Sequence, residues 1–134
     1  MNSHLIDQAL LCPCGSNQSY RTCCGRFLDQ GDFASNAELL MRSRYTAYTL
    51  QRADYLLATW HSSSRPASLD LTSSPQRWMG LTVKRHDQSD TGRAIVEFVA
   101  RYKINGRAYR LHEISRFVHE HEHWFYVDGD ILSD

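Results

Sequence analysis

All four cysteines of this 134-residue chain lie in one short segment, CPCGSNQSYRTCCG, residues 12 to 25. Cys12 and Cys14 are separated by one residue, and Cys23 and Cys24 are adjacent. A segment this short has no hydrophobic core of its own, so another force must order it. Two disulfides, a redox-active pair and a bound metal ion are the three explanations to weigh.

A metal ion accounts for the spacing best. Adjacent cysteines such as Cys23 and Cys24 bond to each other only with strain, and a redox pair requires Cys-x-x-Cys at a helix start, which is absent here. Four thiolates instead form a closed tetrahedral zinc site, which is structural because no coordination position stays open. The predicted cofactor is therefore one structural Zn²⁺, held by Cys12, Cys14, Cys23 and Cys24.

Charge and hydropathy narrow the classes of partner. The chain has 15 basic and 15 acidic residues, so its formal net charge is zero and a nucleic-acid partner is not expected. No apolar run approaches the ~20 residues of a membrane helix, so no membrane partner is expected. The leading segment has no basic region and carries Asp7, unlike a secretion signal. The expected localisation is cytoplasmic, where thiols stay reduced.

The rest of the chain predicts helices followed by an antiparallel sheet, an α+β fold. Ser35 and Glu38 form a capping-box pattern at the start of a helix that extends to residue 50, and a second helix spans 52–60. Residues 61–77 are rich in serine and proline and predict a surface loop. Strand patterns begin at residue 78, and Asn105-Gly106 predicts a two-residue hairpin turn between two of the strands.

That turn fixes a register and hence two faces of the hairpin. The more apolar face, expected to cover the core, carries Val96, Phe98, Ala100, Tyr102, Tyr109, Leu111, Glu113, Ser115 and Phe117. Glu113 then lies among aromatic rings, where a carboxylate requires a partner. Arg44 lies on the core stripe of the first helix, and we hypothesise an Arg44–Glu113 pair.

Five residues are candidates for binding a small ligand at this end of the sheet: Arg44, Trp60, His61, Glu113 and Asp128. Structural roles compete with binding, because ion-pair networks also cluster charges and a cation such as His61 is favoured at a helix end. His119, His121 and His123 alternate in HEHEH, but the last hairpin must turn there, so we expect a charged loop tip instead of a second metal site.

Two segments resemble known families. CPCGSNQSYRTCCG resembles the SEC-C motif, a small zinc finger, and departs from it where Asn17, Gln18 and Ser19 replace a frequent Gly-Lys-Lys run. LLMRSRYTAYTLQRADYLLATWH, WMGL, VEFVARY, LHEISRFV and WFYVDGD resemble the YchJ family of bacterial proteins. The resemblance implies that a SEC-C-type finger, residues 1–27, precedes a cone-shaped domain of the nuclear-transport-factor-type fold, residues 28–134. This cone would pack two or three helices on a curved four-stranded antiparallel sheet.

The resemblance implies no reaction. Nucleic-acid binding by the finger has only Tyr20, Arg21 and Arg26 to support it, and two other function classes stay open. One is a zinc-binding accessory or adaptor protein, whose finger docks to a protein partner and whose cone binds a partner or small ligand. The other is an enzyme that uses Glu113 or Asp128 for acid–base chemistry on a small molecule. A roomy, polar-lined cavity reaching Glu113 would favour ligand binding, and a cone filled by aromatic side chains would favour a structural domain.

Overall fold

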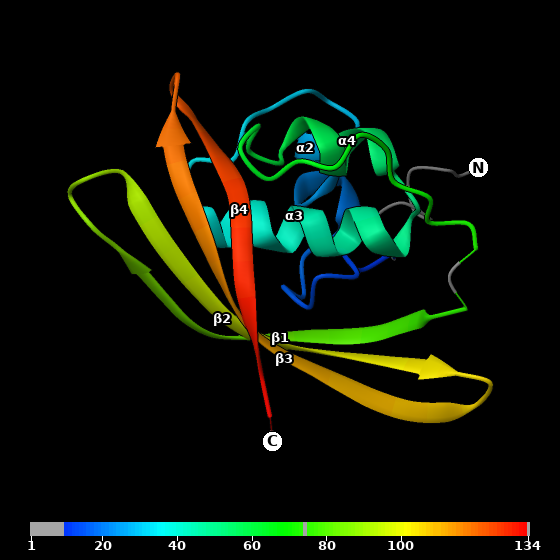
Figure 1. The fold of residues 1–134 in the computed structure, drawn as a ribbon. Coiled ribbons are helices and arrows are strands. Elements are labelled where there is room, and N and C mark those ends of the chain that lie inside the picture. Colours follow the sequence, from blue (N-terminus) through cyan, green and yellow to red (C-terminus); the bar gives the residue numbers. More distant parts are fainter. Residues whose placement is uncertain (1–9, 74, 134) are drawn as a thin grey trace, which may run out of the picture.

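The computed structural model describes residues 10–73 and 75–133, and it confirms the predicted α+β fold (Figure 1). Helices come first and a four-stranded antiparallel sheet of order β1-β2-β3-β4 follows. The helical elements are the 3₁₀ helix η1 (Tyr20–Thr22), α2 (Gly25–Leu28), α3 (Ala37–Thr49) and α4 (Ala53–Ala58). The strands are β1 (Arg77–Gln88), β2 (Arg93–Ile104), β3 (Arg107–Glu120) and β4 (His123–Leu132).

The central hairpin has the predicted register. Ile104 pairs with Arg107, and the pairing continues without a shift to Arg93 and Val118. Asn105 and Gly106 both have positive φ, 52° and 80°, as a type I′ turn requires. The two faces of the hairpin assigned from the sequence are therefore the faces observed.

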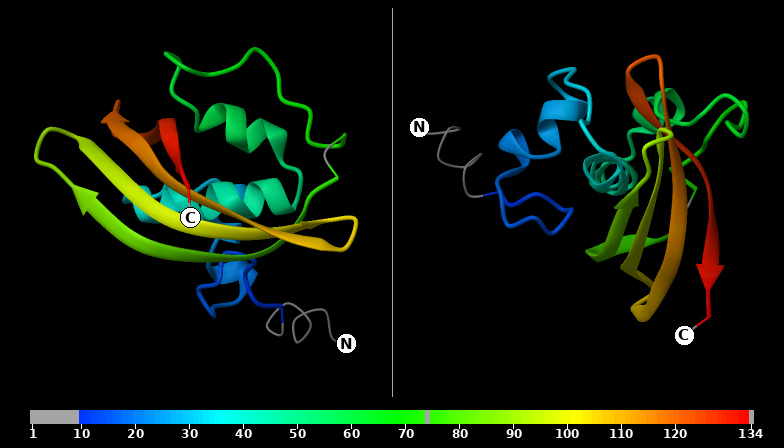
Figure 2. Two further views of the ribbon diagram at one scale, coloured as in Figure 1. Left: turned by 60° about the horizontal axis from the view of Figure 1, so that its bottom comes forward. Right: turned by 90° about the vertical axis from the view of Figure 1, so that its left-hand side faces the viewer.

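The sheet curves around α3 (Figure 2). Register shifts interrupt β1 twice, between Trp78 and Gly80 and between Val83 and Arg85. A third shift lies between Arg116 and Phe117, where β3 pairs with β4. Bulges increase the local bend and twist of a strand, so these irregularities help the strands wrap the helix. Their positions were not evident in the sequence.

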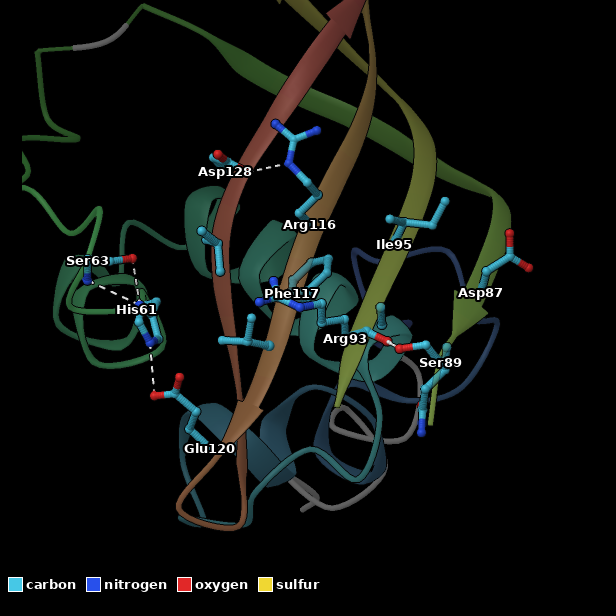
Figure 3. A pocket seen from close by; sticks show the side chains of 14 residues that line it. His61, Ser63, Asp87, Ser89, Arg93, Ile95, Arg116, Phe117, Glu120 and Asp128 are labelled. Carbon is cyan, nitrogen blue, oxygen red and sulfur yellow. Dashed lines mark hydrogen bonds and ion pairs between the residues drawn. The ribbon is translucent and has the colours of Figure 1, made fainter. Parts of the chain in front are cut away.

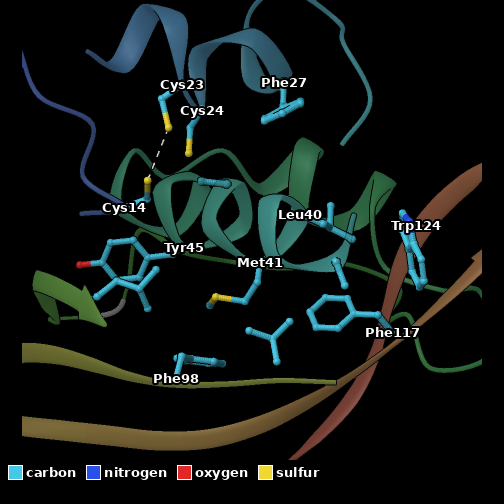
Figure 4. Close-up of a cluster of buried hydrophobic side chains, with 14 of the residues drawn as sticks. Cys14, Cys23, Cys24, Phe27, Leu40, Met41, Tyr45, Phe98, Phe117 and Trp124 are labelled. Atoms are coloured by element: carbon cyan, nitrogen blue, oxygen red, sulfur yellow. Dashed lines mark hydrogen bonds between the residues drawn. The ribbon is translucent and has the colours of Figure 1, made fainter. Parts of the chain in front are cut away.

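Helix α3 is buried on two sides. One side packs on the concave face of the sheet, where Met41 lies near Phe98 and Phe117, and the other side carries the cysteine segment (Figure 4). The cysteines, the helix and the sheet thus share one continuous hydrophobic core. A helix surrounded in this way is shielded around most of its circumference instead of along a single stripe.

The helix begins one residue later than the sequence predicted. Asn36, not Ser35, is the N-cap, and its side-chain oxygen accepts a 2.8 Å hydrogen bond from the Leu39 amide. Glu38 does not complete a capping box, because its carboxylate pairs with Arg42 at 3.1 Å one turn further on. Asn and Ser cap helices about equally well, so two adjacent candidates cannot be ranked from type alone.

Candidate functional site

The four cysteines converge on one point. All four Sγ atoms lie within 4.8 Å of one another, and Cys14 and Cys23 are 3.6 Å apart. A tetrahedral ion with metal–sulfur bonds of about 2.3 Å requires sulfurs roughly 3.8 Å apart. The four thiols are free and buried, so no disulfide forms. The donor set therefore fits a single tetrahedrally coordinated metal ion.

The backbone of the segment explains how the ligands meet. A bridge between Leu11 and Ser19 closes a loop in which the Cys12 amide donates to the Gln18 carbonyl at 2.8 Å. Gly15 turns this loop with φ +82°, and a Cβ there would lie 2.9 Å from the Leu81 carbonyl oxygen. Both its conformation and its close approach to β1 therefore require glycine.

The second pair of ligands comes from the junction of η1 and α2. Cys23 ends η1 and Cys24 caps α2. Gly25 follows, and a Cβ at that position would lie 2.8 Å from the Tyr20 carbonyl oxygen. The Cys-Cys-Gly run thus lets two short helices meet tightly and turns both thiols inward.

Neighbouring polar groups hold the ligands in place. Ser16 Oγ lies 3.1 Å from Cys23 Sγ, and Thr46 Oγ1 of α3 lies 3.7 Å from Cys12 Sγ. Arg42 Nη1, also from α3, donates to the Cys14 carbonyl at 2.8 Å. Such contacts orient metal ligands and tune their basicity. The site is therefore built jointly by the cysteine segment and by α3.

The crowded thiols perturb one another. Hydrogen bonds from Cys12 and Cys24 lower the pKa of Cys14, whereas its own hydrogen bonds to Cys12 and Cys14 raise the pKa of Cys24. Burial raises the pKa of Cys23 to about 11. A bound cation would displace the protons of Cys23 and Cys24, whose pKa values are raised.

The second candidate site is a cavity between α3 and the concave face of the sheet. Its volume is about 290 Å³. Aromatic rings dominate its wall, and the polar lining includes Arg44, Glu113 and Ser115; the other lining residues are Met41, Tyr45, Tyr48, Gln76, Trp78, Phe98, Ala100, Leu111, Phe117 and Tyr126. The cone is therefore not filled by its aromatic side chains.

Arg44 lies at this cavity with its charge almost fully buried, 5% exposed. Nη1 donates to the Leu56 carbonyl at 2.8 Å and to Thr59 Oγ1 at 2.7 Å. The guanidinium lies 5.0 Å from the ring centre of Trp60 and 4.6 Å from that of Tyr126. Burial lowers the pKa of Arg44, and the two rings offset part of that cost through cation–π attraction.

The hypothesis of a direct Arg44–Glu113 ion pair is wrong. Glu113 lines the same cavity but accepts a 2.6 Å hydrogen bond from Ser115 Oγ. Arg44 is satisfied instead by the end of α4, whose carbonyl groups point at it. Sequence patterns do not show where a neighbouring helix aims its last carbonyls, so this partner was missed.

The other three predicted ligand-binding residues lie elsewhere. Trp60 packs on Arg44 outside the cavity lining. His61 and Asp128 line a different hollow of about 730 Å³ (Figure 3). There Arg116 Nε donates to Asp128 at 2.6 Å. Arg44 and Glu113 thus line the cavity, His61 and Asp128 line the outer hollow, and Trp60 lines neither. Their roles in ligand binding stay predictions.

Sequence reasoning missed a hydrogen-bonded chain at this outer hollow. His61 Nδ1 lies 2.7 Å from Ser63 Oγ, and its Nε2 lies 2.9 Å from Glu120. The Ser63 amide also donates to Nδ1, which fixes Nε2 as the protonated nitrogen of the neutral ring. Glu120 is 59 residues away from His61 in the chain, so no local signal could have found the pair.

The HEHEH segment forms a loop tip, as expected. His121 and Glu122 have positive φ and reverse the chain between β3 and β4. His119 packs near Trp124, and His123 stacks on Phe33 with ring centres 3.9 Å apart. Among the described residues, the cysteines are the sole cluster that could hold a metal ion.

The fold and the cysteine site together define a metal-finger protein with a cone-shaped domain. Residues 10–26 match the SEC-C motif, and residues 36–129 match the YchJ middle NTF2-like domain. The chain therefore belongs to the YchJ-like family, also designated UPF0225. The matches confirm both resemblances seen in the sequence.

Relatives and solved structures agree with this assignment. A UPF0225 protein of Bordetella pertussis is 52% identical over 122 residues, covering 90% of this chain and 92% of the relative. One from Polaromonas sp. is 54% identical over 128 residues, covering 89% and 91%. The solution structure of a SEC-C motif protein from Rhodopseudomonas palustris has a TM-score of 0.82 at 31% identity, covering 91% and 98%. The crystal structure of a SEC-C motif protein from Psychrobacter arcticus has a TM-score of 0.76 at 25% identity, and the match covers 96% of this chain and 86% of that one.

The described part of the chain has no helix of the length and apolar character that crossing a bilayer demands. The division of the chain at residues 27 and 28 stays a prediction.

Proposed function

We propose that the protein is a zinc-dependent binding module, in which a structural Zn²⁺ at the four cysteines fixes the finger on α3 and the cone domain receives a small ligand. The observation that carries the metal part is the convergence of four buried Sγ atoms within 4.8 Å. Zinc is the choice because soft thiolates in a tetrahedral set favour it and leave no open position for catalysis. Reduced thiols fit the cytoplasmic location proposed for the protein.

Metal analysis of the purified, reduced protein tests this part. We expect one zinc ion per chain, and its loss in Cys23→Ser, because three thiolates and a hydroxyl bind zinc far more weakly. Thr22→Ser is the matched control, since it changes the adjacent exposed residue and removes no ligand. Metal-free protein with an ordered finger would contradict the proposal.

The ligand part rests on a different observation. A cavity of about 290 Å³ combines an aromatic wall with Glu113, Ser115 and the buried cation of Arg44. Concave, mostly apolar sites with a few convergent polar groups are the usual form of small-molecule sites. A planar ligand that donates hydrogen bonds to Glu113 and lies against the rings would match this lining.

Mass spectrometry of small molecules released from the native protein tests the ligand part. Glu113→Gln should reduce the yield of a released ligand by about tenfold, because an amide accepts a hydrogen bond less strongly than a carboxylate. Glu97→Gln is the control, since Glu97 contacts His112 and Arg85 and does not line the cavity. A ligand retained equally by both variants would place binding elsewhere.

Acid–base catalysis in the cone is the second candidate function. Glu113 supports it, because its carboxylate faces the cavity and is positioned by Ser115. Asp128 does not, because it lines the outer hollow and pairs with Arg116. The test is whether the wild-type protein converts the released ligand chemically. Conversion that is lost in Glu113→Gln, while that variant still binds the ligand, would identify the protein as an enzyme.

Docking of the finger to a protein partner is the remaining part of the proposal. Leu10 and Leu11 support it, because they are 57% and 61% exposed where the chain enters the finger. The SEC-C resemblance adds an analogy and no partner. A pull-down with the wild type and with Leu10→Ser/Leu11→Ser, finding identical partners, would count against the finger as the docking element.

A further inference from the structure

The charges of this neutral chain are unevenly distributed. Residues 71–86 and 98–112 contain no Asp or Glu. Seven of the chain's 15 basic residues lie in these two stretches, and five of the seven lie on neighbouring ends of β1, β2 and β3: Arg77, Arg101, Lys103, Arg107 and Arg110. A net charge of zero therefore conceals a local basic region, and local charge decides which polyanions bind.

The sheet gathers these residues at one end. Arg77 pairs with Lys103 across β1 and β2, and Arg101 pairs with Arg110 across β2 and β3. Arg107 follows the Asn105-Gly106 turn. The β2–β3 hairpin projects past the helices at this end (Figure 1). Arg77, Arg101, Lys103 and Arg110 lie on the convex face of the sheet, and Arg107 and Tyr109 lie on the opposite face of the same hairpin end, because side chains alternate between faces along a strand. We call the five basic residues, together with Met79, Ala108 and Tyr109, the basic hairpin surface, which includes both faces of this end of the hairpin.

Intramolecular carboxylates do not neutralise most of this surface. Elsewhere Arg42, Arg52, Arg85 and Arg116 each pair with an Asp or Glu. Within the part of the chain that the structure describes, Arg77, Arg101, Lys103 and Arg107 have no acidic partner. Like charges on paired positions, such as Arg77 and Lys103, repel each other. A bound polyanion would relieve that repulsion.

The surface is also hollowed and partly aromatic. A shallow groove of about 390 Å³ lies at this end of the sheet and is lined by Arg101, Lys103 and Arg110 together with Met79, Tyr102, Ala108 and Tyr109. Met79 is 53% and Tyr109 40% exposed. Tyr109 stacks on Tyr102 with ring centres 5.4 Å apart, and Arg107 lies 5.8 Å from the Tyr109 ring. These rings widen the surface available for stacking.

We propose that the basic hairpin surface binds single-stranded nucleic acid. Guanidinium groups suit phosphate oxygens in both geometry and charge, and the exposed Tyr109 ring, beside Arg107 on the other face of the hairpin, supports stacking of unpaired bases. An acidic protein is the weaker alternative, because the centres of protein–protein interfaces are depleted in charge, whereas nucleic-acid interfaces are strongly basic. The proposal depends on neither the metal nor the cone cavity.

Fluorescence anisotropy of a fluorescein-labelled 12-nucleotide RNA, titrated with the full-length protein, tests it. We expect saturable binding in low salt. Contacts to four phosphates would give a slope of about −3 in the logarithm of the association constant against the logarithm of the salt concentration. Lys103→Glu/Arg107→Glu should weaken binding by at least about tenfold. Arg65→Glu/Arg93→Glu is the control, with the same charge change at exposed sites outside the surface.

Further measurements distinguish single-stranded nucleic acid from duplex DNA and from an acidic protein. Tyr109→Leu should lose about tenfold in affinity if a base stacks on the ring, and melting curves of each variant must match the wild type. Equal losses in the charge variant and its control would overturn the proposal, as would the absence of saturable binding. Tighter binding of duplex DNA would overturn the single-strand assignment. Stronger competition by polyglutamate than by unlabelled RNA would assign the surface to an acidic protein.

Discussion

At the scale of single residues, some roles follow from local spacing in the sequence, and others depend on partners from distant elements. The convergence of the four cysteines is predictable from the sequence, because their close spacing restricts them to a local geometry. The partner of Arg44 is not, because the Leu56 carbonyl and Thr59 reach it from α4. Local chemistry was predictable and long-range pairing was not.

Gly15→Ala should destabilise the fold more than Gly31→Ala. Both glycines have a positive φ, +82° and +80°, so both variants carry the cost of a left-handed residue, about 1 kcal/mol. Only at Gly15 would the new methyl meet a backbone oxygen, that of Leu81. We expect an extra loss of about 1–2 kcal/mol in the free energy of unfolding, measured by urea titration. Equal losses would show that the close approach is not limiting.

Arg44→Lys should destabilise the protein although it retains the charge. A lysine ammonium cannot contact the Trp60 and Tyr126 rings as a planar guanidinium does while it also reaches the Leu56 carbonyl and Thr59. We expect a loss of about 2–4 kcal/mol, typical of a buried charge deprived of its partners, read from thermal melting. Arg65→Lys, at an exposed arginine, should melt like the wild type. An unchanged melting temperature in Arg44→Lys would refute the stabilising role assigned to the Arg44 guanidinium.

At the scale of elements, the Asn-Gly turn made the central hairpin predictable residue by residue. Its two positive-φ positions specify the turn, and the turn specifies every cross-strand pair. The bulges in β1 and at Arg116 were not predictable. A bulge inserts a single residue, and the strand segments before and after it each still alternate polar and apolar residues as a regular strand does. The curvature that creates the cavity thus came from features the sequence does not mark.

Metal retention by the cysteine segment should depend steeply on pH. Cys23 and Cys24 have raised pKa values, so the metal must displace their protons on binding. The apparent affinity therefore falls as pH falls, by up to about tenfold per pH unit for each proton displaced. A zinc-sensitive dye should report release of the ion as the pH is lowered from 7 to 5. Release independent of pH would argue against thiolate ligands.

At the scale of the whole molecule, the finger and the cone share one hydrophobic core. The buried cysteines and Phe27 belong to the same core cluster as Leu40, Phe98 and Phe117. No pattern in the sequence indicates that α3 is covered on both sides. Net charge was similarly uninformative, because an overall sum does not record where the charges lie.

A chain consisting of residues 28–134 should therefore be less stable than the intact protein. Removal of the finger uncovers one side of α3, including Thr46 and Ala47, which are fully buried in the intact chain. We expect a markedly lower melting temperature and increased binding of the dye ANS to exposed apolar surface. Identical melting of the truncated and intact chains would show that the cone folds independently of the finger, as the predicted division at residue 28 implies.

The placement of all ligands within residues 12–24 has a consequence for biosynthesis. The segment leaves the ribosome before α3 and the sheet exist, so it can capture its ion while the remainder is still being translated. The rest of the chain would then collapse onto an already rigid nucleus. Copies made while the metal ion is scarce would lack that nucleus and would be open to proteolysis, which would tie the abundance of the protein to the metal supply of the cell.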